Sequence, residues 1–135
     1  MLRVYTTYVR SVAEYAVPSF HSMMTKTQKT SLERQQYNAL KIIYGFTYSY
    51  TELLSKSGLD TLEERRKNLT DKFALKMKNN PKYSHYFPER GEDRRRARNG
   101  NKYVEHEAGT ARLYNSPLFY MRRRLNVLER EGRTH

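Results

Sequence analysis

The sequence predicts an all-α protein: a small bundle of about four helices over residues 1–87, then a basic, partly disordered extension over 88–135 that ends in a helix. Three observations predict it. Apolar residues recur at helical spacing over much of residues 2–79. Capping residues open several of these stretches, and Gly or Pro closes them. The apolar residues are also unevenly distributed along the chain.

This uneven distribution separates a part that can pack from one that cannot pack alone. Leu, Ile, Val and Phe make up about 19% of the 135 residues, and the net charge is +12, which borders on the composition of disordered chains. These four residue types make up about 22% of residues 1–87 and about 15% of residues 88–135. We therefore expect that the first region can pack and that the second cannot form a core alone.

The first two predicted helices cover residues 2–17 and 27–44. Pro18 is expected to end the first, because the residue before a proline is disfavoured in the helical conformation. Thr25 or Thr27 can cap the second, which Gly45 ends. Its inward stripe is expected to consist of Leu32, Gln36, Ala39, Leu40 and Ile43.

Two further helices follow within the first region. Ser49 and Glu52 form the pattern of a capping box, and Gly58 ends this helix of about two turns. Thr61 and Glu64 repeat the pattern at the start of a helix that reaches Asn79, before Asn80-Pro81. The expected apolar face of this last helix consists of Leu62, Leu69, Phe73 and Met77.

The second region begins with a charged, glycine-punctuated linker. Residues 102–114 have no clear period and favour an extended segment or a short strand. Ser116-Pro117 then opens a helix that runs to about Glu131, since proline suits the first helical position.

Several classes of protein are excluded. The chain has no cysteine, so it has no disulfide, thiolate nucleophile or Cys-based zinc site. No apolar run approaches the ~20 residues that span a bilayer, and the N-terminus lacks the apolar segment of a secretory signal. We expect an intracellular protein, in the nucleus or the cytoplasm, with no membrane partner. The charge favours nucleic acid over the alternative, an anionic membrane surface.

Catalytic and metal sites are not predicted, and no cofactor is expected. The four histidines are scattered along the sequence. We interpret Glu105-His106-Glu107 as a polar loop rather than a metal site. Glu63 and Glu64 are read as charges that favour a helix N-terminus rather than as an acid–base pair.

Basic side chains are the candidate nucleic-acid ligands, because cations neutralise phosphates. The candidates are Arg65, Arg66, Lys72, Lys76, Arg94, Arg95, Arg96, Arg98, Arg122, Arg123 and Arg124. The alternatives are a solvated helix face and a flexible segment kept soluble by charge. Tyr44, Tyr48 and Tyr50 could stack on bases, but half-buried packing is the favoured interpretation.

Several segments together resemble one family, the non-LTR (LINE-type) reverse transcriptases. Residues 8–21 (YVRSVAEYAVPSFH) are similar to the helix and proline turn that follow the polymerase active site. Residues 32–45 (LERQQYNALKIIYG) match the next segment, and 49–54 (SYTELL) continue the pattern. Leu59, Leu62, Arg65, Arg66, Leu69, Phe73 and Lys76 follow, and the tail matches at Lys102–Glu105, Arg112, Tyr114–Pro117 and Tyr120.

The resemblance implies a thumb and post-thumb region, a helical bundle that grips a template–primer duplex through its backbone. The paired aspartates of the family's palm, which bind Mg²⁺, do not occur here, so we expect a truncated fragment of an RNA-directed DNA polymerase without polymerisation of its own. Tyr37 and Asn38 also stand where the family often has Lys-Arg, which removes about two phosphate contacts.

The palm is a further implied partner, and its absence has a predicted consequence. The first helix would dock on the palm, so without it Val9, Val12 and Tyr15 are expected to be exposed. Two alternatives to the nucleic-acid function remain: an independent helical protein-interaction module, and an inert product of a degenerate element.

Overall fold

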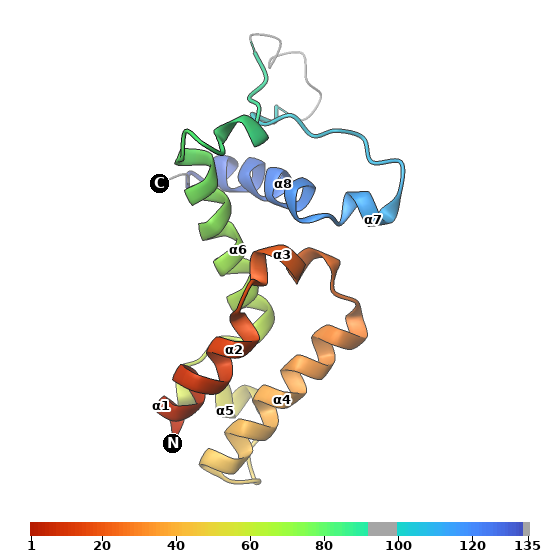
Figure 1. Ribbon diagram of the computed structural model, residues 1–135. Helices are drawn as coiled ribbons and strands as arrows, with labels where there is room; N and C mark the ends of the chain where they lie inside the picture. The colour runs from red at the N-terminus through yellow and green to blue at the C-terminus, as the bar shows by residue number, and fades with distance from the viewer. Residues whose placement is uncertain (92–99, 134–135) are drawn as a thin grey trace. The chain divides into compact units, whose positions relative to one another are not determined.

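The computed structural model describes residues 1–91 and 100–133, and it is predominantly helical (Figure 1). The all-α class is confirmed: across these two ranges there is no strand, only an isolated antiparallel bridge between Glu89 and Tyr103. The chain forms two compact units. Unit 1 comprises Met1–Val17 and Met24–Asn68, and unit 2 comprises Pro18–Met23 and Leu69–His135.

These bounds differ from the predicted regions 1–87 and 88–135 because one helix serves both units. Helix α6 (Leu62–Asn79) begins in unit 1 and ends in unit 2. Its buried residues recur every fourth position, at Leu62, Arg66, Thr70 and Ala74. The predicted face is therefore wrong at Phe73, which is 41% exposed, because the inward stripe contains polar residues that an apolar pattern does not reveal.

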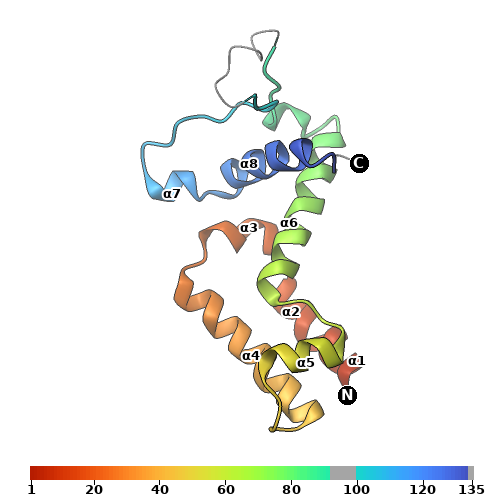
Figure 2. The same cartoon turned by 180° about the vertical axis from the view of Figure 1, so that it is seen from behind.

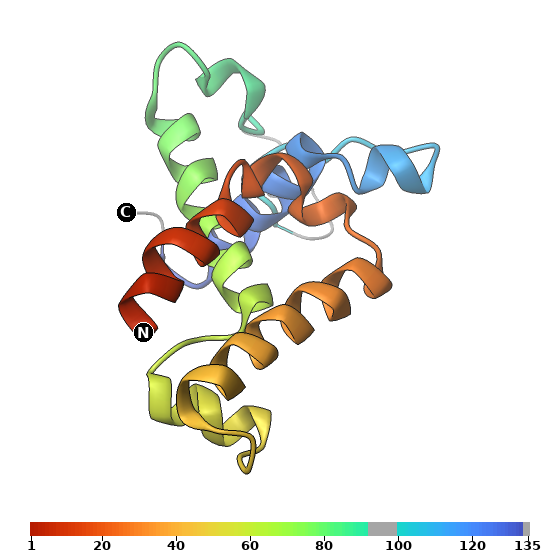
Figure 3. The same cartoon turned by 60° about the horizontal axis from the view of Figure 1, so that its bottom comes forward.

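Helices α4 (Lys26–Tyr44) and α5 (Tyr50–Ser57) have the predicted ends. Thr25 with Gln28, and Ser49 with Glu52, form complete capping boxes, in which each cap side chain accepts from a backbone N–H. Gly45 and Gly58 follow the two helices with positive φ, which glycine adopts at little cost. The reversal between α4 and α5 is visible in Figure 3.

The first predicted helix, 2–17, is shorter than expected. Helix α1 (Leu2–Val4), a π-helical turn (Tyr5–Val9) and α2 (Arg10–Glu14) follow one another without a break. The segment ends at Glu14, because Tyr15 is extended and Ala16 has a left-handed φ of 56°. Pro18 lies in the next short helix, α3 (Val17–Phe20), near its start, where a missing N–H costs nothing.

Unit 2 packs around helix α8 (Pro117–Arg130), with Pro117 at its start as predicted. Its core consists of Ala74, Phe87, Tyr103, Met121, Leu125 and Leu128. Ala74 and Phe87 precede residue 88, so residues 100–133 do not supply this core alone. A short 3₁₀ turn (Ser84–Tyr86) and a four-residue helix, α7 (Ala111–Tyr114), complete the unit; Figure 2 shows α7 leading into α8.

One side chain fixes the extended segment at residue 103 on α8. The Asn126 amide accepts from the Tyr103 N–H (2.8 Å) and donates to the Tyr103 carbonyl (3.1 Å). Both contacts are buried. The amide therefore satisfies the backbone N–H and carbonyl of Tyr103, which make no hydrogen bond to a neighbouring strand in the described chain. The prediction of an extended segment over residues 102–114 is therefore correct near Tyr103. The short helix α7, which the Thr110 hydroxyl caps, was not predicted.

Candidate nucleic-acid interface

The exposed side of α6 in unit 2 carries two of the predicted cations. Lys72 and Lys76, one turn apart, are both exposed, and neither has a hydrogen bond or ion pair within the described part of the chain. Phe73 lies beside them and is partly exposed. We call Lys72, Phe73 and Lys76 the α6 lysine patch. Its ammonium groups are available to neutralise phosphates.

Arg65 and Arg66, on the same helix in unit 1, have internal roles. Arg65 donates from Nε and Nη2 to the two carboxylate oxygens of Glu14 (2.9 and 3.3 Å). Arg66 is 1% exposed, and burial lowers the pKa of its guanidinium despite the opposing effects of Glu33, Glu63 and Tyr50. Arg66 therefore cannot contact a phosphate without unfolding, and Arg65 does so only by sharing its charge with Glu14.

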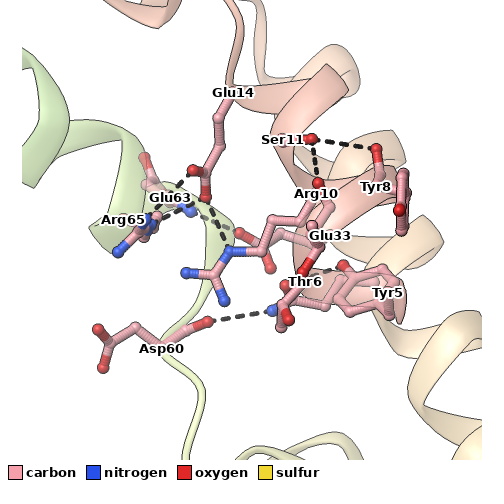
Figure 4. A network of polar contacts seen from close by, with 12 residues as sticks. Tyr5, Thr6, Tyr8, Arg10, Ser11, Glu14, Glu33, Asp60, Glu63 and Arg65 are labelled. Carbon is pink, nitrogen blue, oxygen red and sulfur yellow. Dashed lines mark hydrogen bonds and ion pairs between the residues drawn. The ribbon is translucent and has the colours of Figure 1, made fainter. Parts of the chain in front are cut away.

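Glu14 is the anionic centre of this part of unit 1 (Figure 4). It accepts from Arg65 and, one helical turn away, from Arg10 Nε (2.8 Å). Burial raises the pKa of Glu14, but the hydrogen bonds and charges of the two arginines outweigh it and hold the pKa below its usual value. Arg10 and Arg65 therefore bind Glu14 and hold α2 against the first turns of α6.

A second polar network surrounds Gln36 on α4. The Gln36 amide accepts from the Tyr5 hydroxyl (3.1 Å) and donates to the Tyr50 hydroxyl (3.0 Å). It also donates to the Asp60 backbone carbonyl (3.1 Å). These contacts connect three segments of unit 1 through one buried amide.

Glu33 completes this network. It accepts from the Tyr50 hydroxyl (2.5 Å) and from the backbone N–H of Glu63 in the first turn of α6 (2.7 Å). Burial and the bond to Glu33 raise the pKa of Tyr50. Tyr50 is therefore a packed, hydrogen-bonded tyrosine, as favoured from the sequence, and Tyr48 packs under the Lys56 ammonium at 3.3 Å.

The arginine run 122–124 on α8 divides into three different environments. Arg122 is buried and donates from Nε to the Tyr86 carbonyl (2.9 Å). Arg124 makes a two-pronged ion pair with Asp71 of α6, at 2.8 and 2.5 Å. Arg123 has no acidic partner in the described ranges; its guanidinium stacks on the Tyr114 ring at 3.7 Å.

The structure therefore separates the predicted ligands. Lys72, Lys76 and Arg123 are available to an anion, and Arg65 is shared with Glu14. Arg66 is buried, and Arg122 and Arg124 make contacts within unit 2. Arg94, Arg95, Arg96 and Arg98 lie outside the described residues. Tyr114 was missed as a candidate; the sequence clue to it is the acid-free stretch 108–128, which contains four arginines.

Within residues 1–91 and 100–133, no group of three or more His, Asp or Glu side chains could hold a metal ion. Glu105 accepts from the amides of Asn101 (2.8 Å) and Asn126 (2.6 Å) instead. In the same ranges, no helix has the length and apolar character needed to cross a membrane.

Comparison with known proteins adds no identification. No protein-family model matches the chain, and neither a curated protein nor a solved structure matches it.

Proposed function

We propose that the chain is the thumb and post-thumb region of a non-LTR reverse transcriptase, and that it binds a template–primer duplex through phosphate contacts without reading sequence. The order and spacing of the resembling segments, from Tyr8 to Tyr120, support the family origin. A bundle of about four helices over residues 1–87, followed by a basic extension, is part of this proposal.

The α6 lysine patch is the observation that carries the binding function. Most other predicted cations of the described chain are paired or buried, whereas Lys72 and Lys76 are solvated and lie one turn apart on one helix. Such a pair can follow a phosphate backbone, and backbone contacts supply affinity rather than specificity. The net charge of +12 adds a long-range attraction for any polyanion.

We do not propose polymerisation by this chain. Phosphoryl transfer in polymerases needs paired carboxylates that hold two metal ions, and the sequence has no Asp-Asp pair. Asp71, one of its few aspartates, is engaged by Arg124. Mg²⁺ would belong to the palm of a parent polymerase. Metal-dependent extension of a primed RNA template by the pure chain would contradict this part.

Salt-titrated binding tests the proposal. A fluorescently labelled RNA–DNA duplex is expected to bind at about 50 mM salt, with an affinity that falls linearly on a log–log plot as salt rises. The measurement is fluorescence anisotropy over a series of salt concentrations. Absence of binding at about 50 mM salt would overturn the proposed function, because electrostatic attraction is strongest there.

A helical protein-interaction module is a second candidate, and one specific observation favours it. The outer side of the α1–α2 segment and the residue after it carries apolar and aromatic side chains that are each more than 50% exposed: Val4, Tyr8, Val9, Val12 and Tyr15. Its inner side is polar, with Arg10 and the Tyr5 hydroxyl making internal contacts. A helix with its apolar side toward solvent suits a protein partner, such as a palm. If the chain does not bind a duplex at low salt, that result would favour this candidate.

A further inference from the structure

Arg123 and Tyr114 form a fixed cation–aromatic pair at the junction of α7 and α8. The Arg123 guanidinium lies 3.7 Å from the centre of the Tyr114 ring, and its Nη1 donates to the Tyr114 carbonyl (2.8 Å). A distance below about 6 Å is typical of a cation–π interaction. Although the Arg123 guanidinium lies over its ring, Tyr114 is 51% exposed. We call Tyr114 and Arg123 the α7–α8 platform.

The surrounding backbone holds the platform in place. The Thr110 hydroxyl accepts from the Leu113 N–H (3.2 Å), and the Tyr114 N–H donates to the Thr110 carbonyl (3.0 Å). Ser116 then donates to the Leu113 carbonyl (3.0 Å), directly before α8 begins at Pro117. With the backbone fixed in this way and Arg123 over one part of the ring, Tyr114 loses little conformational freedom when a ligand stacks on it.

The charge around the platform favours an anionic ligand. Residues 108–128 contain no Asp or Glu, and of their four arginines Arg122 and Arg124 are engaged in the fold. Arg123 uses one N–H on the Tyr114 carbonyl, and its other donors have no hydrogen bond in the described chain. Arg112, two residues before Tyr114, is also exposed on α7. Phosphate oxygens fit these donors.

We propose that the α7–α8 platform binds single-stranded nucleic acid, with an unpaired base stacked on Tyr114 and its phosphate near Arg123. This inference rests on the proposed function and deepens it: the bound nucleic acid has a single-stranded part. An aromatic ring gains from stacking only where a base presents a free face, and a paired base inside a duplex presents none. An arginine on the same ring adds a cation for the backbone.

The test compares one strand with its duplex. The probes are labelled oligo(dT) strands, either alone or annealed to oligo(dA). Their length of about 20 nucleotides exceeds the usual site size of such stacking surfaces. The variant Tyr114→Leu removes the ring, Tyr114→Phe retains it, and Phe46→Leu removes an exposed aromatic residue of unit 1 as a matched control. Circular dichroism melting verifies that each variant is folded.

Tyr114→Leu is expected to weaken single-strand binding by about 10-fold or more and duplex binding by less than about twofold. Tyr114→Phe and Phe46→Leu are expected to bind both probes like the unaltered chain. Unchanged single-strand binding by Tyr114→Leu, or an equal loss on both probes, would overturn this inference while leaving the proposed function intact. Failure of the unaltered chain to bind either probe would overturn both.

Discussion

Replacing Asp71 with alanine is expected to lower the free energy of unfolding by about 3 kcal/mol. Asp71 is the only acidic residue within hydrogen-bond distance of Arg124 among the described residues, and it accepts from both Nε and Nη2. Both side chains are largely buried, at 9% and 15% exposure. Removing the carboxylate leaves the guanidinium charge without compensation in a poorly solvated place.

The measurement is urea unfolding followed by helical circular dichroism. Lys72→Ala is a matched control, because Lys72 is the next residue and is exposed; its change should stay within about 0.5 kcal/mol. The double variant Asp71→Ala/Arg124→Leu should recover part of the loss, since it removes the unpaired charge as well. A loss below about 1 kcal/mol for Asp71→Ala would show that Arg124 is solvated and free to bind phosphate.

Gln36→Ala is expected to destabilise unit 1 by about 3 kcal/mol, because it breaks three hydrogen bonds of a buried amide at once. The buried Tyr5 hydroxyl loses its acceptor, and an unsatisfied buried group costs about 1–3 kcal/mol. The Asp60 carbonyl, in a partly buried contact, loses a donor as well. The removed side chain also leaves a cavity at a position that is 1% exposed.

The neighbouring residue offers the control for this variant. Gln35 is the preceding residue of α4 and is exposed, so Gln35→Ala should change the free energy of unfolding by no more than about 0.5 kcal/mol. Urea unfolding of the two variants side by side gives the comparison. Equal stabilities would mean that the Gln36 network does not hold α4 to its neighbours.

Local chemistry made the helix ends predictable. Thr25, Ser49, Gly58 and Pro117 act at helix ends within a few residues of sequence, so their roles follow from capping and turn preferences alone. The stripe through Gln36 and Leu40 follows from the period of one helix. The end of the first helix was mispredicted because Ala16 adopts a left-handed conformation that its residue type does not favour.

The candidate site was less predictable, because a run of cations does not reveal which of its members the fold uses. Asp71 and Arg124 are 53 positions apart, and Glu14 and Arg65 are 51 apart. Only the tertiary packing brings these pairs together. Phe73 was expected inside for the same reason: the inward side of α6 includes polar residues such as Asp71, whose partner Arg124 on α8 makes its burial tolerable.

The salt dependence of duplex binding by the variant Lys72→Ala/Lys76→Ala tests most directly whether the α6 lysine patch contacts phosphates. We expect the log–log slope of affinity against salt to fall in magnitude by about 1.8 relative to the unaltered chain, since two phosphate contacts are lost. Lys72→Arg/Lys76→Arg retains both charges and should retain the slope. A slope unchanged in the alanine variant would contradict the claim that the α6 lysine patch binds the phosphate backbone.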